Sequence, residues 1–401
     1  MPVIGTAGHV DHGKTALIAA LTGIDTDRLP EEKARGMTTD LGFAHFKGGG
    51  MTIGVIDVPG HERYMRNMVA GAWGIDGAML VVAADDGWME QTARHAEVLA
   101  ALGVPIIVIV VTKADTVPEA RVAIVAEEAR SRLAELSPTV SPPWVAVDSL
   151  RGRGIAELGG ILIAALGALG AKPAGEAAPF LFADRAFTLP GPGLVVTGSL
   201  RGGPLSAGDE LLLLPAGERL RVRSLQRYGV PAQVAEPGSR VAISFLKSRT
   251  TLARGDCLAS PESSFRATKS CYLALDRRYT SWKPRTGLTL ESATGTVHVD
   301  AQLWLARTPG FIRVVFDVPV ATAPGQAVIL LRKGGADILA SGRVLAIGGE
   351  AADDRRRIEA VLPSAREAAL VDGASIAQVR GAFDLAYAGC LPLGSGLALP
   401  A

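Results

Sequence analysis

Cysteine, surplus charge and long apolar runs are all scarce in this sequence of 401 residues. Its three cysteines (Cys257, Cys271 and Cys390) form no Cys-x-x-Cys pair, so we expect neither a disulfide framework nor a cysteine zinc site. The 41 Lys and Arg nearly balance the 40 Asp and Glu, so a nucleic-acid partner would have to be held by a local patch. No apolar run approaches the roughly 18 residues of a membrane span, and no signal peptide is evident. We therefore expect a soluble, cytoplasmic chain with no membrane partner.

A phosphate loop is predicted over residues 8–15, which read GHVDHGKT. An apolar strand precedes this turn and a helix follows it, so backbone amides and the helix dipole would face a phosphate. Lys14 would reach the β- and γ-phosphates, and the Thr15 hydroxyl would bind Mg²⁺. We expect His9 and His12 to shape the turn rather than to bind zinc. The predicted nucleotide-binding residues of the loop are Asp11, His12, Gly13, Lys14 and Thr15.

The first part of the chain alternates short apolar runs with segments of helical spacing. Such runs are typical of parallel strands that are buried on both faces. The pattern predicts a doubly wound α/β domain over residues 1–170. The expected strands are 54–58, 78–83 and 106–111, and the expected helices are 90–102 and 120–136.

The character of the sequence changes after a small linker at 171–179, which contains Pro and Gly. Short apolar runs separated by Gly, Pro and Asp turns predict a β-barrel over 180–262 and a second one over 265–347. Residues 350–401 are expected to form a weakly patterned tail.

Further nucleotide-binding residues are predicted in loops that follow strands, where open α/β sheets bind ligands. Thr38 would bind Mg²⁺ only while a γ-phosphate is present, so its loop would order with one nucleotide and relax with the other. Asp57 would hold Mg²⁺ through water, Gly60 would donate its amide to the γ-phosphate, and His61 would orient the attacking water. Each of these motifs alone is a common turn, and His61 alone could be an ordinary packed histidine. Their order along the chain favours the functional interpretation.

The base of the nucleotide is predicted to bind at Thr112-Lys113-Ala114-Asp115, after another strand. The Asp115 carboxylate would accept two hydrogen bonds from a guanine edge, and adenine lacks that donor pair. We therefore expect GTP and GDP, with Mg²⁺, as the cofactors.

Taken together, these motifs resemble those of SelB-type selenocysteine-specific elongation factors, which are translational GTPases of the elongation factor Tu superfamily. The resemblance covers residues 1–347 and implies an α/β P-loop GTPase domain followed by two all-β barrel domains and a short C-terminal tail. Motifs carrying it include residues 8–15, 27–33, 35–38, 40–43, 57–62, 67–68, 85–87, 112–115, 184–187 and 193–198.

The resemblance implies that a GTP-bound protein carries selenocysteinyl-tRNA to the ribosome and releases it after hydrolysis. It makes His61 the catalytic histidine, Asp115 the guanine reader, and Thr15, Thr38 and Asp57 the magnesium site. It also places an aminoacyl-tRNA pocket on Asp184, Arg185 and Arg240. A selenol is largely ionised near neutral pH, so fixed arginines would favour it over serine's hydroxyl. Ordinary surface charge is the alternative for these arginines.

Two departures from the family pattern affect the interpretation. The last guanine-contacting motif, usually Ser-Ala, appears as Asp148-Ser149, where the backbone amide of Ser149 could still serve. Only about fifty residues follow the second barrel, too few for the winged-helix modules that grip a messenger hairpin in bacterial SelB proteins. Arg355 to Arg357 and the helix-like residues 364–370 could be the remnant of one such module, but we favour a solvated charge run on a short appended helix. Hairpin recognition would then come from another factor, or the chain is cut short of its recognition domains.

Two further functional hypotheses remain open. A degenerate paralogue could bind GTP and regulate a partner without delivering tRNA, although an intact set of Thr15, Thr38, Asp57 and His61 favours turnover. The GTPase subunit of sulfate activation shares the G domain and the barrels, but the SelB-like segment around Thr38 argues against it.

Overall fold

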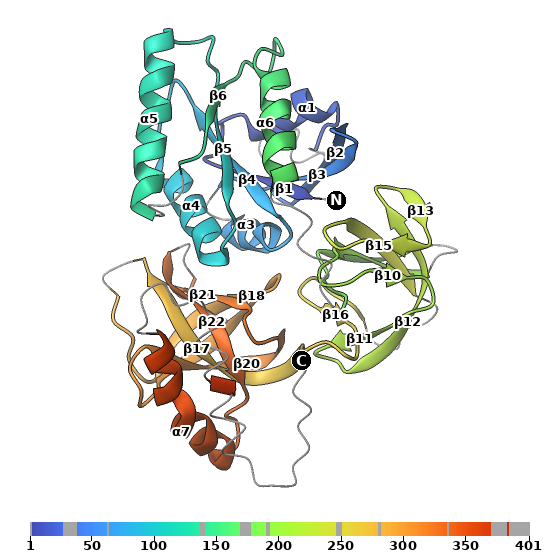
Figure 1. Ribbon diagram of the computed structural model, residues 1–401, viewed down its shortest axis with the longest axis vertical. Coiled ribbons are helices and arrows are strands. Elements are labelled where there is room, and N and C mark those ends of the chain that lie inside the picture. The colour runs from blue at the N-terminus through green and yellow to red at the C-terminus, as the bar shows by residue number, and fades with distance from the viewer. Residues whose placement is uncertain are drawn as a thin grey trace. The chain divides into compact units, whose positions relative to one another are not determined.

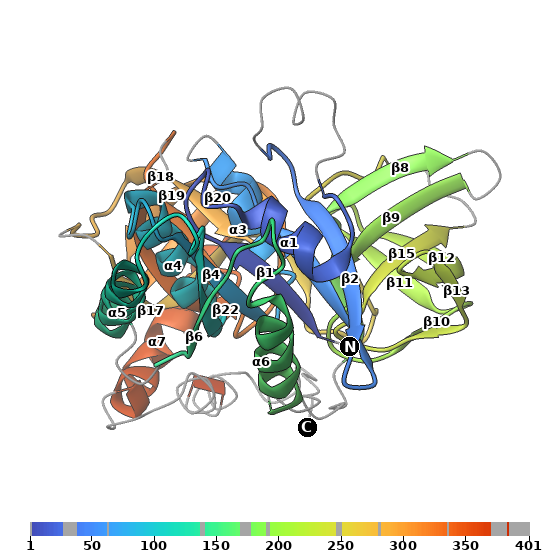
Figure 2. The same cartoon turned by 90° about the horizontal axis from the view of Figure 1, so that it is seen from above.

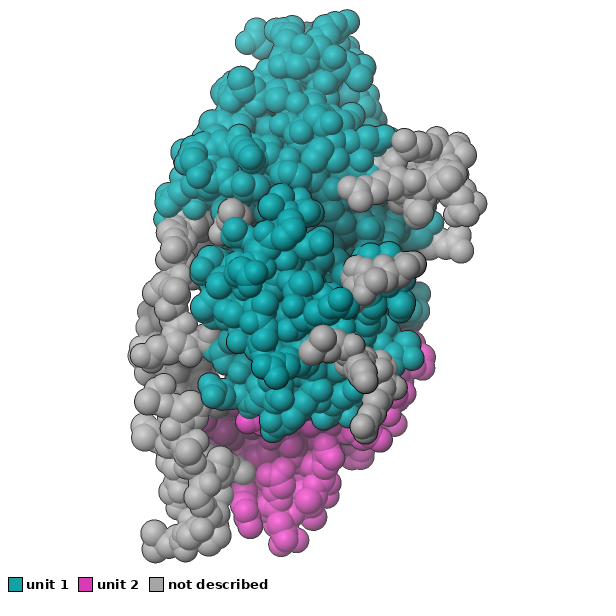
Figure 3. Space-filling model, turned by 90° about the vertical axis from the view of Figure 1, so that its right-hand side faces the viewer, with its two compact units in different colours: residues 1–263, 295–298, 334–338 teal, residues 264–294, 299–333, 339–401 magenta. Residues whose placement is uncertain are grey.

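The structure is a computed structural model, and its chain divides into two compact units (Figures 1 and 3). The first comprises residues 1–263, 295–298 and 334–338, and the second comprises 264–294, 299–333 and 339–401. The residues described are 2–26, 38–61, 64–136, 141–168, 178–189, 193–245, 251–279, 282–334, 337–369 and 383–384. The predictions for 27–37, for Glu62, for linker residues 171–177 and for most of the tail therefore lie outside the described residues.

A six-stranded sheet forms the centre of the N-terminal region. The strand order is β2-β3-β1-β4-β5-β6, with β2 antiparallel to β3 and the other neighbours parallel. The strands β1 and β4 are buried along their whole length, as expected for strands covered on both faces. Their bounds are β1 Val3–Ala7, β2 Gly42–Gly48, β3 Met51–Asp57, β4 Gly77–Ala83, β5 Ile106–Thr112 and β6 Trp144–Ala146.

Helices cover both faces of this sheet (Figure 1). Leu17 of α1 and Leu158 and Leu162 of α6 share one apolar core with Val55 and Val81 of the strands. The helices α3, α4 and α5 cover the other face. Strand order reverses at β1, whose neighbours β3 and β4 come later in the chain, and such a switch point is where open α/β sheets bind ligands. The helices are α1 Lys14–Thr22, α3 Met65–Ala72, α4 Glu90–Leu102, α5 Glu119–Leu136 and α6 Ile155–Ala168.

The rest of the first unit is all β. Its main sheet has eight strands in the order β7-β16-β11-β12-β15-β9-β8, with β13 paired to β12, and β10 pairs with β14 separately. In Figure 2, β8 and β9 form a long antiparallel hairpin. Leu and Val side chains from alternate positions fill its core. The strands are β7 Phe180–Phe182, β8 Arg185–Leu189, β9 Gly193–Ser199, β10 Leu205–Ser206, β11 Glu210–Leu214, β12 Glu218–Arg227, β13 Val230–Ala232, β14 Val234–Ala235, β15 Arg240–Phe245 and β16 Cys257–Ala259.

The second unit is built on a closed barrel in the order β17-β20-β19-β18-β21-β22. Closure pairs the edge strands with each other and so leaves no open sheet edge. The strands are β17 Arg266–Arg278, β18 Leu288–Thr294, β19 Val297–Leu305, β20 Phe311–Thr322, β21 Ala327–Leu331 and β22 Ile338–Ile347. The predicted fold class, an α/β domain followed by β-domains, is confirmed.

The beginning of the tail differs from its prediction. Helix α7 spans Ala352–Ala369, so it starts well before residue 364. Ile358, Val361, Leu362 and Ala365 are buried on one face and pack on the barrel residues Tyr272, Phe311 and Leu345. Their i, i+3, i+4, i+7 spacing is that of an amphipathic helix, and Pro363 within it hid the pattern. The helix is therefore packed and not merely solvated. Among the helices of the described residues, none is long and apolar enough to cross a membrane.

Candidate functional site

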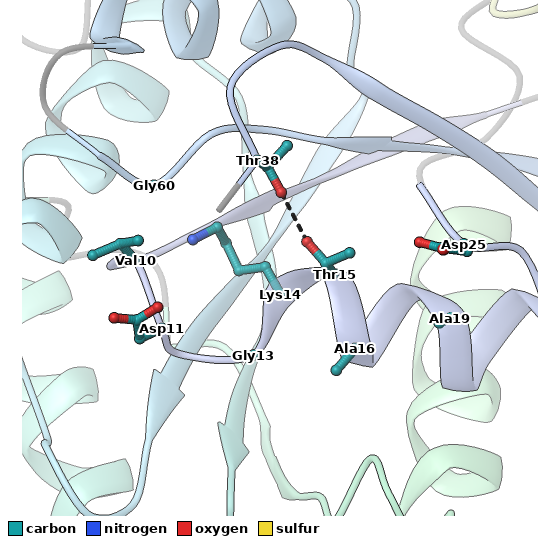
Figure 4. A pocket seen from close by; sticks show the side chains of 10 residues that line it. All are labelled: Val10, Asp11, Gly13, Lys14, Thr15, Ala16, Ala19, Asp25, Thr38 and Gly60. Atoms are coloured by element: carbon teal, nitrogen blue, oxygen red, sulfur yellow. Dashed lines mark hydrogen bonds between the residues drawn. The ribbon is translucent and has the colours of Figure 1, made fainter. Parts of the chain in front are cut away.

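A pocket opens where β1 passes into α1 (Figure 4). The turn bends through left-handed backbone at Asp11, with φ 62°, and at Gly13, with φ 76°. This geometry leads directly into the N-terminus of α1, which offers amides to an anion. The pocket is lined by Val10, Asp11, Gly13, Lys14, Thr15, Ala16, Ala19, Asp25, Thr38 and Gly60.

Lys14 is buried in this pocket, at 7% exposed. Its Nζ donates to the carbonyl oxygens of Gly8 at 3.1 Å and of His9 at 2.6 Å. Burial lowers the pKa of Lys14 to about 8. A phosphate beside Nζ would favour the charged ammonium, since an opposite charge stabilises it.

Three hydroxyls surround the wholly buried carboxylate of Asp57 at the end of β3. Oδ2 accepts from Thr15 Oγ1 at 2.8 Å and from Thr26 Oγ1 at 2.9 Å, and Oδ1 accepts from Thr6 Oγ1 at 2.9 Å. Burial raises the pKa of Asp57, while these hydrogen bonds act in the opposite direction. Thr15 Oγ1 also lies 3.0 Å from Thr38 Oγ1 (Figure 4). All three predicted magnesium residues thus meet, and hydroxyl and carboxylate oxygens are ligands that fit Mg²⁺.

Gly60 lies against the phosphate loop so closely that a side chain could not fit. A Cβ at this position would be 2.4 Å from Lys14 Nζ and 2.6 Å from the backbone nitrogen of Val10. His61 follows, and its ring meets that of Tyr64 edge-on with centroids 6.2 Å apart. Gly60 lines the pocket, whereas His61 is outside the set of described residues that line it. The catalytic role of His61 remains a prediction.

Two side chains of α4 fix the backbone of the phosphate loop. His95 Nδ1 accepts from the Gly8 amide at 3.1 Å, and Gln91 Oε1 accepts from the Val10 amide at 3.1 Å. Complete burial lowers the pKa of His95 to about 3, which keeps the ring neutral and able to accept. Neither residue was identified from the sequence, because α4 approaches the loop only in the folded sheet.

His12 connects the phosphate loop to strands β4 and β5. Its carbonyl oxygen accepts from Thr112 Oγ1 at 2.7 Å, and its Nδ1 lies 3.3 Å from the Val81 carbonyl oxygen. Burial lowers the pKa of His12 to about 4. The ring therefore packs against the sheet as a neutral group, so both His12 and Thr112 shape the loop from within.

The predicted base-binding residues follow β5. Lys113 has left-handed backbone, with φ 52°, and its Nζ lies 3.0 Å from Asp85 Oδ2. Asp115 pairs with Arg151, which also donates to Asp148 Oδ2 at 3.1 Å. The Arg151 backbone amide, which donates to Asp148, lowers the pKa of that carboxyl.

Ser149 follows Asp148 at this end of the site. Its Oγ is buried and has no hydrogen-bond partner in the described part of the chain. A polar atom of this kind fits a site that a ligand completes.

The three predicted aminoacyl-pocket residues meet beside β2. Arg240 forms an ion pair with Asp184, with Nη2 2.9 Å from Oδ1. Its guanidinium carbon lies 3.4 Å from the centre of the Phe43 ring, and that of Arg185 lies 4.9 Å from it. Arg185 also donates to the Leu41 carbonyl oxygen at 2.7 Å. Both arginines therefore converge on one aromatic ring of the G domain, a contact that sequence reasoning missed.

A third arginine from the all-β part of the first unit, Arg254, contacts the same segment. Arg254 Nη1 lies 3.1 Å from Asp40 Oδ1 and 3.0 Å from Asn67 Oδ1. Asn67 in turn donates to the Thr39 carbonyl oxygen at 2.8 Å. Asn67 of the G domain therefore contacts the segment from Thr39 to Phe43, and so do the three arginines of the all-β part of the first unit.

A phosphate loop lies beside a cluster of carboxylate and hydroxyl oxygens, and this combination defines a P-loop nucleotide-binding protein. Residues 1–168 match the family described as the elongation factor Tu GTP binding domain. Elongation factor Tu 2 of Streptomyces avermitilis is 36% identical over 282 residues, covering 65% of this chain and 72% of that protein. The chain therefore belongs to the elongation factor Tu family of GTP-binding proteins, and its pocket fits GTP or GDP with Mg²⁺.

Within this family the chain is similar to selenocysteine-specific elongation factors. That of Escherichia coli (strain K12) is 36% identical over 393 residues, covering 96% of this chain and 62% of that protein. The crystal structure of a bacterial selenocysteine-specific elongation factor, EF-Sec, matches with a TM-score of 0.83 at 30% identity, covering 92% of this chain and 62% of that one. The chain spans 41–62% of the length of the curated selenocysteine-specific relatives it matches.

Proposed function

We propose that this chain is a GTP-hydrolysing elongation factor that delivers selenocysteinyl-tRNA to the ribosome in the cytoplasm. The observation that carries the proposal is the position of Arg185 and Arg240 on Phe43. Phe43 stands five residues after Thr38, which meets Thr15 in the pocket. One short segment therefore joins the nucleotide site to the residues proposed to hold the cargo.

In the nucleotide site, Lys14 and the amides of the loop would bind the phosphates. Mg²⁺, when bound, would supply positive charge against the negative phosphates. Thr15, Thr38 and Asp57 would hold it, and the close approach of Gly60 supports an amide contact to the γ-phosphate. His61 would orient the attacking water. Because Thr38 would bind Mg²⁺ only while the γ-phosphate is present, hydrolysis would release the segment that leads to Phe43.

In the cargo site, Arg185 and Arg240 would favour a selenolate over a neutral serine hydroxyl. Asp184 holds Arg240 in place, since its Oδ1 accepts both from that guanidinium and from Thr197 Oγ1, the latter at 2.6 Å. A fixed guanidinium loses less conformational entropy on binding an anion than a mobile one. The contact with Phe43 would link this preference to the nucleotide state.

Recognition of a messenger hairpin is assigned in this proposal to another factor. We also propose that the chain divides into a G domain at 1–170, barrels at 180–262 and 265–347, and a tail at 350–401.

The proposal is tested by titrating the GTP-loaded protein with three aminoacyl-tRNAs at one stated salt concentration, because phosphate contacts dominate such affinities. These are selenocysteinyl-tRNA, seryl-tRNA of the same body and an ordinary elongator aminoacyl-tRNA. We expect strong preference for the selenocysteinyl form over its seryl twin. Equal or absent binding of all three would instead favour a regulatory GTPase that lacks the cargo.

A further inference from the structure

One arginine at the base end of the site joins two carboxylates. Arg151 Nη1 donates to Asp148 Oδ2 at 3.1 Å and also to Asp115 Oδ2. Asp115 is the residue predicted to read guanine, so Arg151 contacts the recognition group directly. It belongs to none of the nucleotide-binding motifs identified in the sequence.

Asp148 explains why a cation is needed here. It stands where the family pattern has serine, and at 4% exposed its side chain is almost buried. Its Oδ1 accepts the backbone amides of Leu150 and Arg151, each at 3.0 Å. These bonds fix a negative charge near Asp115, and like charges at close range repel.

We propose that Arg151 is a positioning residue for guanine recognition, which offsets the charge of Asp148 and orients the carboxylate of Asp115. An ionised carboxylate offers about four lone-pair sites, so one hydrogen bond from Arg151 leaves room for the two donors of a guanine edge. The inference rests on the proposed function, in which Asp115 contacts the base. Ser149 Oγ, buried and unpartnered among the described residues, places a further polar group on this turn.

Binding of GDP and of inosine diphosphate to Arg151→Met tests the proposal. Inosine lacks the 2-amino group, so a misplaced Asp115 should affect it less. The arginine side chain is 67% exposed, and an exposed ion pair is weak, so we expect the Kd of GDP to rise about fivefold and that of inosine diphosphate about twofold. Arg151→Lys should restore most of the preference. Arg153→Met, which removes a neighbouring exposed arginine, is the control and should change neither value.

The charge of Asp148 is tested in a double-mutant cycle. Asp148→Asn keeps the acceptor for the Leu150 and Arg151 amides but removes the charge, so Arg151→Met should weaken GDP binding less in this background than in the unmodified protein. Equal losses in both backgrounds would overturn the proposal. An unchanged preference in Arg151→Met would also do so, as would a gain in GDP affinity, which would show that Arg151 competes with the base.

These outcomes are separable from failure of the proposed function. If the unmodified protein does not bind GDP, both the function and this inference are wrong. If it binds GDP and the Arg151 variants leave its base preference unchanged, only the inference is wrong.

Discussion

The two ends of the nucleotide site are built in different ways. At the phosphate end, Lys14 is 7% exposed and Asp57 is fully buried, and their partners are backbone carbonyls and threonine hydroxyls. At the base end, Asp115 is 24% exposed and Arg151 is 67% exposed, and the contacts are ion pairs between side chains. The side chains of the phosphate end are therefore buried in the G domain and fixed by its packing. At the base end, single substitutions of exposed side chains can change the contacts without disturbing that packing.

Energetics follow the same division. A buried polar group left without its partner costs about 1–3 kcal/mol, whereas an exposed ion pair contributes about 0–1 kcal/mol. Substitutions at the phosphate end should thus alter affinity, catalysis or stability strongly, and those at the base end should mainly alter which nucleotide is preferred.

The largest effect is expected for His61→Ala. If this histidine orients the attacking water, ribosome-stimulated GTP hydrolysis should fall about a thousandfold, while the Kd of GTP changes less than twofold. Single-turnover hydrolysis and equilibrium binding measure the two quantities separately. A matching loss of GTP affinity would show that His61 is structural and belongs with the buried phosphate end.

Lys14→Ala should weaken binding of GTP and GDP by about a hundredfold, because a charge-assisted hydrogen bond to phosphate is lost. The exposed Lys47 of β2 provides the control variant Lys47→Ala, which should bind normally. Isothermal titration gives both affinities, and circular dichroism checks that the variants are folded. Near-normal binding by Lys14→Ala would remove the contrast between the two ends.

Asp115→Asn should change the preference for the nucleotide base and leave the fold intact. Replacing a carboxylate acceptor by an amide donor should weaken GDP binding by about tenfold and improve binding of xanthosine diphosphate. Competition between the two nucleotides measures the change. An unchanged base preference would place the guanine site elsewhere and leave the base end without a function.

The smallest effect concerns pH and the buried histidines of the phosphate end. The pKa values of His12 and His95 are lowered from 6.5 to about 4 and about 3 in the folded chain, so the unfolded chain binds more protons below pH 6.5. Their contribution to stability is complete above pH 6.5 and is lost as the pH falls towards the folded values. At pH 5.5 each histidine should lower the free energy of unfolding by about 1 kcal/mol.

Urea denaturation at pH 7.5, 6.5 and 5.5 measures this loss. His95→Leu should remove about half of the pH-dependent part, although it also loses the acceptor for the Gly8 amide. If the free energy of unfolding falls as much on acidification in His95→Leu as in the unmodified protein, groups other than His95 are responsible for the fall.

Local pattern was enough to predict most elements of the G domain. The helix expected at 90–102 is α4 with the same bounds, and the strand expected at 106–111 is β5. Helix α7 was placed too late, because Pro363 interrupts a pattern whose apolar stripe has its partners on the barrel. An apolar stripe of this kind shows which face of a helix is buried only when the surface against which it packs is also known.

The sequence by itself determined the phosphate loop, the strand-following motifs and the change from α/β to β structure. These depend on residues close together in the chain, where turn geometry and periodicity act. Only the tertiary structure decided that His95 and Gln91 hold the loop, that Thr6 and Thr26 share Asp57, and that Arg151 joins Asp115 to Asp148. Most of these partners are separated by 31 or more positions, and hydrogen bonds between such residues follow from how elements pack, which no local pattern records.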